Sequence, residues 1–138
     1  MIVYLDSSVV LRRLLAQPGV LLSWGTWTAA YSSDLLAVEC RRVIDRLRLE
    51  GLYDDAQVAR AMEQLTEIER TIHRLRLSRS VIHEASRTMP TIVKTLDAIH
   101  LASAILIRER RAIDLLFATH DTQQAVAARA LGFTILES

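Results

Sequence analysis

Four acidic residues lie at the end of, or inside, stretches that otherwise consist of apolar residues suited to a protein core. Asp6 and Asp121 each come after a short apolar run that predicts a buried strand. Glu39 and Asp97 each interrupt the apolar stripe of a predicted helix. An isolated buried carboxylate is costly unless it is paired, protonated or bound to a metal ion. We therefore expect a fold that brings these four acids together in one shared site.

Segments with strand character alternate with segments of helical character along the chain. Apolar or alternating runs predict strands at residues 2–5, 73–77, 113–118 and 133–136. Capping residues before amphipathic stretches predict helices from Ser7 or Ser8 to about Ala16, from Ser33 or Asp34 to about Glu50 with Gly51 as its stop, from Asp54 or Asp55 with apolar residues as far as Ile72, from Ser78 or Ser80 to before Pro90, from about Thr95 to Arg110, and from Asp121 to Leu131. The stretch 26–33 is ambiguous. This order predicts an α/β fold with a central, mainly parallel sheet flanked by helices, in a single domain spanning residues 1–138.

The composition is that of an ordinary globular domain, with 51% hydrophobic and 24% charged residues. The formal charge of +1 gives no overall field that would attract nucleic acid, and the excess of arginine over lysine is explained as well by a GC-rich gene as by phosphate binding. The single cysteine, Cys40, is predicted to be a small packed thiol. The N-terminus does not resemble a secretion signal, and Pro18, Gly19 and Gly25 interrupt the uncharged stretch 14–33, so we expect a cytoplasmic protein outside the membrane.

Functional groups of a parallel sheet gather beyond the carboxyl ends of its strands, which is where Asp6 and Asp121 are expected. If the helices that carry Glu39 and Asp97 pack across that edge, all four acids face one crevice. Two carboxylates 4 Å apart repel by ~4 kcal/mol at an intermediate dielectric constant, and a divalent cation removes this conflict. Mg²⁺ or Mn²⁺ prefers such oxygen ligands, and these ions activate water and stabilise the transition state of phosphodiester cleavage.

The order and spacing of four motifs resemble one known family. They are Val3-Tyr4-Leu5-Asp6-Ser7-Ser8, Ser33-Asp34-Leu35-Leu36-Ala37-Val38-Glu39, Leu96-Asp97-Ala98-Ile99-His100-Leu101-Ala102-Ser103-Ala104 and Ala118-Thr119-His120-Asp121. Together, over essentially the whole chain, they resemble a PIN-domain ribonuclease, and most of all the VapC-type toxins of bacterial type II toxin–antitoxin pairs. Each motif alone is common by chance, whereas the set in this order is specific.

The resemblance implies a Mg²⁺- or Mn²⁺-dependent endoribonuclease that cleaves RNA phosphodiesters with metal-activated water. Carried over by position, it makes Asp6 and Asp97 direct metal ligands, Glu39 and Asp121 ligands directly or through water, and Thr119 a supporting residue. It also implies a homodimer and a small VapB-like antitoxin that covers the active groove and provides the only link to DNA.

Simpler interpretations exist for each acid. Asp6 and Asp121 are also suited to helix N-caps, and Glu39 and Asp97 could be half-exposed partners of Arg42 and Arg108 or of similar residues.

Other side chains are predicted to be structural. His100 shares a helix face with Asp97 and could contact a carboxylate, but we expect an ordinary satisfied helix residue. We expect the side chain of His120 to point away from the site, and Trp24 and Trp27 to serve packing or a dimer contact rather than base stacking. His73 and His83 have no partner at the spacing of a zinc site.

Two other functions remain open on the sequence alone. The chain could be a PIN nuclease of RNA processing outside any toxin–antitoxin pair, or an inactive PIN-like binding module. Retention of all four acids argues against the inactive module.

Overall fold

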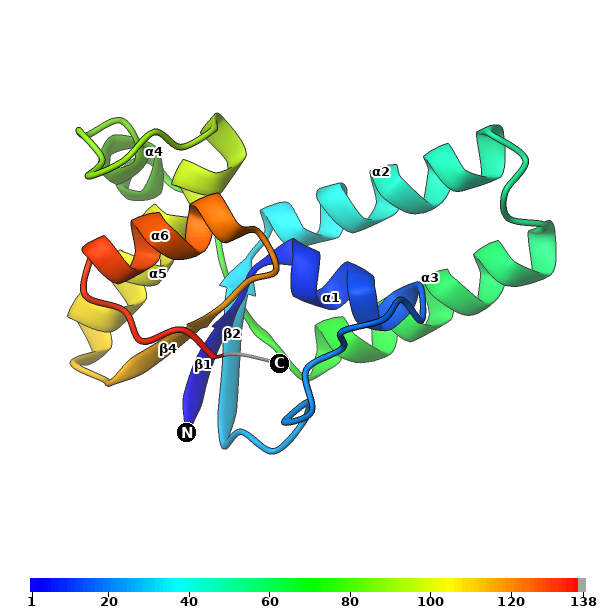
Figure 1. The fold of residues 1–138 in the computed structure, drawn as a ribbon, viewed down its shortest axis with the longest axis horizontal. Helices are drawn as coiled ribbons and strands as arrows, with labels where there is room; N and C mark the ends of the chain where they lie inside the picture. The colour runs from blue at the N-terminus through cyan, green and yellow to red at the C-terminus, as the bar shows by residue number, and fades with distance from the viewer. Residues whose placement is uncertain (137–138) are drawn as a thin grey trace.

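The computed structural model describes residues 1–136 and shows strands and helices in alternation (Figure 1). The strands are β1 (Ile2–Leu5), β2 (Ala29–Ser33), β3 (His73–Leu75) and β4 (Leu115–Ala118). The helices are α1 (Ser7–Leu14), α2 (Leu35–Leu49), α3 (Asp55–Arg70), α4 (Arg79–Ala85), α5 (Thr95–Arg111) and α6 (Thr122–Ala130). The predicted α/β class is confirmed.

The sheet has the order β3-β2-β1-β4, and every one of these strand pairs is parallel. β1 is therefore central, with Ile2 opposite Ala29 of β2 on one side and opposite Leu115 of β4 on the other. Because all strands run the same way, their carboxyl ends meet at one edge, and the helices that follow β1, β2 and β4 begin there.

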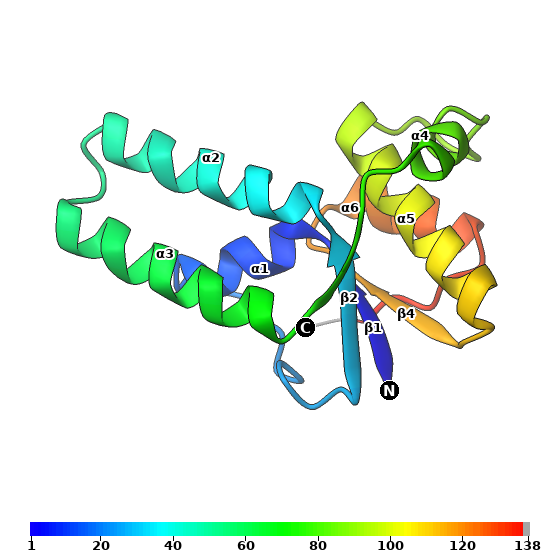
Figure 2. The ribbon, with the colours of Figure 1, turned by 180° about the vertical axis from the view of Figure 1, so that it is seen from behind.

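Helices cover both faces of the sheet, as Figures 1 and 2 show from opposite sides. Val3 and Leu5 of β1 pack with α1, α2 and α3 into one core, whereas Tyr4 packs with α5, β4 and α6 into another. This follows from the alternation of side chains along a strand. No helix within residues 1–136 is long and apolar enough to span a bilayer.

The ambiguous stretch 26–33 contains β2, whose sequence Ala-Ala-Tyr-Ser-Ser has little of the usual apolar strand signal. Ser32 and Ser33 are nevertheless fully buried. The Ser32 hydroxyl donates to the Leu5 carbonyl 2.7 Å away, and the Ser33 hydroxyl accepts from the Leu35 amide at 3.0 Å. These bonds satisfy both hydroxyls, so a strand that ends in serines can occupy the core.

The predicted last strand, 133–136, is reduced to a single parallel bridge between Ile135 and Phe117. The Phe117 amide donates to the Thr134 carbonyl, and the Leu136 amide donates to the Phe117 carbonyl. The segment thus touches the outer side of β4 at one residue only. Residues 137–138 lie outside the described part.

Other sequence predictions hold at the level of single side chains. Cys40 is a fully buried thiol in the core of α1, α2 and α3, and Trp24 and Trp27 pack against that core in an edge-to-face pair 5.2 Å apart. Gly51 follows α2 with a φ of +73°, the left-handed conformation that glycine adopts without strain.

Candidate metal-dependent nuclease site

Asp6 occupies the junction of β1 and α1 and is 4% exposed. It is the N-cap of α1, as one simple interpretation predicts, and its Oδ2 accepts from the Ser8 amide at 3.2 Å. The same Oδ2 also accepts from the Ser8 hydroxyl at 2.5 Å and from the Thr119 hydroxyl at 3.2 Å. Three donors therefore contact the same oxygen of Asp6, Oδ2. The other oxygen, Oδ1, takes no part in capping the helix.

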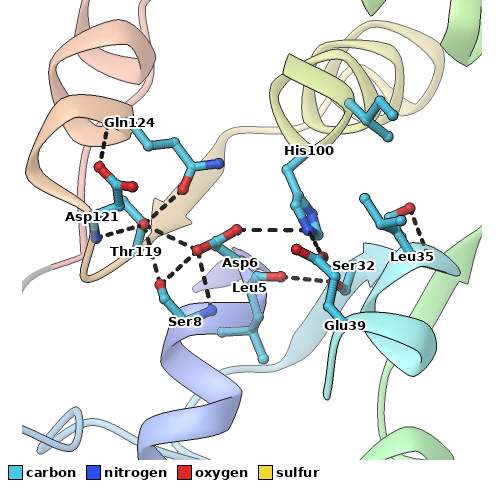
Figure 3. Close-up of polar contacts among 12 residues, drawn as sticks. Leu5, Asp6, Ser8, Ser32, Leu35, Glu39, His100, Thr119, Asp121 and Gln124 are labelled. Atoms are coloured by element: carbon cyan, nitrogen blue, oxygen red, sulfur yellow. Dashed lines mark hydrogen bonds and ion pairs between the residues drawn. The ribbon is translucent and has the colours of Figure 1, made fainter. Parts of the chain in front are cut away.

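Thr119 and Asp121 lie just after β4, beside Asp6 (Figure 3). Asp121 is the N-cap of α6, and its Oδ1 accepts from the amides of Gln123 and Gln124. The Thr119 hydroxyl accepts from the Asp121 amide at 3.0 Å and lies 2.7 Å from Oε1 of Gln124. Thr119 thus joins the loop after β4 to the loop after β1.

Glu39 on α2 meets the same edge through His100 of α5 (Figure 3). His100 is fully buried, with its Nε2 2.6 Å from Oε1 of Glu39 and 3.6 Å from Oδ1 of Asp6. Its Nδ1 lies 2.7 Å from the Tyr4 hydroxyl. Burial acts to lower the pKa of His100, but the hydrogen bond with Glu39 and the charge of Asp6 raise it above its ordinary value.

Asp97 lies in the first turn of α5 and is partly buried. Its pKa is raised from 3.8 to about 6, first by burial and then by the negative charges of Asp6 and Asp121. Among residues 1–136, no side chain forms an ion pair or hydrogen bond with the Asp97 carboxylate. A carboxylate that has no ion-pair partner and lies in the negative field of other acids would be stabilised by a divalent cation.

The arginine partners considered for the helical acids are wrong. Arg42 pairs with Asp45 at 3.4 Å, and Arg108 donates to the Leu131 carbonyl while stacking over Phe133. In the described chain, no arginine or lysine forms an ion pair with any of the four acids.

Helix starts compensate part of this negative charge. Asp6 and Asp121 are N-caps and Asp97 is in a first turn, so each lies at the positive end of a helix dipole. Such ends also favour anions, among them phosphate groups.

The donor set suits a hard divalent cation, because it consists of carboxylate oxygens, of which only those of Asp6 and Glu39 have an ion-pair partner in the described chain, His100. As the side chains stand, however, no three His, Cys, Asp or Glu residues of the described chain form a group that could hold a metal ion. One oxygen of Glu39 is bonded to His100, and one oxygen of Asp121 accepts from an amide of its own helix. The residue types fit the ion, and the four acids would have to come closer together to enclose it.

Sequence reasoning underestimated His100 and missed Gln124. His100 is satisfied, as expected, but one of its two partners is the site acid Glu39. Gln124 is fully buried, and its Nε2 has no partner among residues 1–136. Its only sequence signal is an amide within an alanine-rich helix. The predicted outward orientation of His120 stays a prediction, since only its amide is placed in the network, as a donor to Ser8.

Comparison with known proteins agrees with this geometry. The family model for the PIN domain matches residues 3–130. No curated protein matches the chain. PIN domains are generally nucleases that act on RNA and typically bind divalent metal ions. With a parallel sheet that presents acids at its carboxyl edge and a match over most of its length, the chain belongs to the PIN-domain family.

Proposed function

We propose that this chain is a Mg²⁺- or Mn²⁺-dependent endoribonuclease and the toxin of a VapBC-type toxin–antitoxin pair. The observation that carries the proposal is Asp97, a carboxylate without a cationic partner in the described chain whose pKa is raised by burial and by Asp6 and Asp121. A carboxylate of this kind would only lower the stability of the fold if its role were structural. A metal ligand, in contrast, has to be a carboxylate that no cationic side chain occupies.

Asp6 and Asp97 are the proposed direct ligands of the ion, and Glu39 and Asp121 are proposed to hold it directly or through water. When bound, Mg²⁺ or Mn²⁺ supplies activation of water and stabilisation of negative charge on the phosphodiester.

The other residues of the site orient these acids. Ser8 and Thr119 hold Oδ2 of Asp6, while its Oδ1 lies 3.6 Å from Nε2 of His100. Preorganised groups of this kind cost no rearrangement during the reaction.

The proposed partners are RNA as substrate, a second copy of the chain and a VapB-like antitoxin. Ile82, Ile92 and Leu96 are large apolar side chains exposed near the start of α5, with Ile92 85% exposed. Two of them, Ile82 and Ile92, line a cavity of about 440 Å³ together with Ala98, the neighbour of Asp97. Exposed apolar surface beside the first turn of the helix that carries Asp97 supports an antitoxin segment as its cover.

The first test is cleavage of end-labelled RNA by purified protein freed of any partner. We expect cleavage with Mg²⁺ or Mn²⁺, none with EDTA, and a loss of at least about 100-fold in Asp6→Asn and Asp97→Asn, the size expected when charge stabilisation is removed. The matched control is Asp114→Asn, because Asp114 is exposed just before β4, at the opposite end of that strand. Metal-independent cleavage, or full activity in either site variant, would reject the mechanism.

The toxin role requires a separate test in cells. Induction of the chain without an antitoxin should arrest growth and produce new RNA ends at discrete positions, and Asp97→Asn should do neither. Cleavage in vitro without growth arrest would favour the RNA-processing nuclease, and absence of cleavage with both metals would favour the inactive binding module.

A further inference from the structure

We propose that His100 and Tyr4 are positioning residues of the metal site, which orient Glu39 toward the cation and keep it apart from Asp6. The inference rests on the proposed metal-dependent function and adds two residues to it. The contact network spans three elements, with Tyr4 in β1, His100 in α5 and Glu39 in α2.

His100 contacts both sides of the site from a fully buried position. Its Nε2 lies 2.6 Å from Oε1 of Glu39 and 3.6 Å from Oδ1 of Asp6, so the imidazole stands between two carboxylates that would otherwise repel each other. A carboxylate has two oxygens, and the imidazole occupies one of those on Glu39. The other oxygen, Oε2, remains for a cation or its water.

Tyr4 fixes the orientation of the His100 imidazole ring. The Tyr4 ring is fully buried, lies parallel to Phe117 with centroids 5.3 Å apart and meets the His100 ring edge-on at 5.8 Å. The Tyr4 hydroxyl lies 2.7 Å from Nδ1 of His100, and a phenol is protonated at neutral pH, so it can donate to that nitrogen. A neutral imidazole that accepts this hydrogen bond at Nδ1 carries its proton at Nε2, and an imidazolium carries a proton on each nitrogen, so Nε2 donates to Glu39 in both forms.

A purely structural role for the network makes a different prediction. If His100 and Tyr4 only satisfied each other in the core, their removal would change stability and leave metal affinity unchanged. If they orient Glu39, metal affinity falls even in variants that remain folded, because partners of metal ligands typically contribute about 10–100-fold in affinity.

The experiment is titration of the RNA-free protein with Mn²⁺, followed by calorimetry or by the electron paramagnetic resonance signal of free Mn²⁺. Tyr4→Phe keeps the aromatic packing and removes only the hydroxyl, and we expect about tenfold weaker Mn²⁺ binding. His100→Leu removes the donor to Glu39 and should weaken binding by about 10–100-fold. His100→Gln retains an N–H near the position of Nε2 and should restore part of this loss.

Thr66→Val is the matched control. The Thr66 hydroxyl donates to the Met62 carbonyl of its own helix, α3, which carries none of the proposed metal ligands. The Mn²⁺ affinity of this variant should equal that of the wild type, and thermal unfolding establishes that each variant is folded.

Wild-type affinity in both Tyr4→Phe and His100→Leu would overturn the inference while leaving the proposed nuclease untouched. Weakened binding in these variants supports it even if no RNA is cleaved, in which case the proposed function alone fails. A wild-type chain that binds no Mn²⁺ overturns both.

Discussion

The Thr119 hydroxyl lies 3.2 Å from Oδ2 of Asp6, although 113 residues separate the two in the sequence. This hydrogen bond joins the residues after β4 to the residues after β1. The two strands are neighbours in the sheet. Thr119 also accepts from the Asp121 amide, so one hydroxyl orders two of the proposed ligands.

Thr119→Val tests this bond, because valine has the same shape and no hydroxyl. We expect a loss of about 1 kcal/mol in the free energy of unfolding and about tenfold weaker RNA cleavage, as a typical hydrogen bond contributes on this scale. Denaturant unfolding and cleavage rates measure the two effects. Thr66→Val is the control, because the Thr66 hydroxyl donates to the Met62 carbonyl of its own helix and to no other residue among 1–136. A similar loss of cleavage in this variant would contradict the assignment.

Asp97→Asn should stabilise the metal-free protein above pH 6. The folded chain holds a proton on Asp97 up to a pKa of about 6, whereas the usual value is 3.8, so the free energy of unfolding falls as the pH rises between these values. Removing the charge should recover about 1–2 kcal/mol at pH 7.5, a discounted value because the side chain is partly exposed, and almost nothing at pH 4. Urea unfolding with EDTA at both pH values measures this.

Mg²⁺ should make the wild type more stable than Asp97→Asn. Binding to the folded state stabilises it by about 2.7 kcal/mol at 100 times the dissociation constant, and the wild type should gain more than Asp97→Asn. Equal gains in thermal unfolding would show that Asp97 does not hold the ion.

Glu69 should contribute to stability without affecting the site. It accepts from Arg41 at 2.7 Å and from Arg74 at 2.8 Å, and its side chain is 10% exposed. Glu69→Gln should therefore cost about 1.5–3 kcal/mol in unfolding free energy while Mn²⁺ affinity stays constant. Glu67→Gln is the control, since its pair with Arg70 is exposed on both sides and should contribute nearly nothing. A comparable cost in both variants would contradict the importance of burial.

Cys40 should be inert toward thiol reagents in the folded protein. Burial first, and then the charge of Glu39, raises its pKa to about 12, and the thiolate is the reactive form. Reaction with a disulfide reagent should require denaturant, and its rate in buffer should follow the unfolding equilibrium. Fast labelling under native conditions would show that the thiol is accessible.

The sequence predicted the α/β order because β1 and β4 are short apolar runs and the long helices α2 and α3 carry apolar stripes. β2 escaped prediction because its buried serines are satisfied by Leu5 and Leu35, partners that local sequence does not reveal. The four acids were predictable because a carboxylate in a core stripe is conspicuous. Gln124 was not, since a polar side chain in a helix is common on a surface and only the packing of α6 buries it.

The central position of β1 also determines when the acidic cluster can form during folding. Asp6 comes early in the chain, but Thr119, which fixes it, arrives only once β4 has paired alongside β1. A partly folded species that lacks this distant pairing does not hold Asp6 and Asp121 beside each other. Assembly of the acidic cluster is therefore a late event of folding, because it depends on some of the most non-local contacts of the chain.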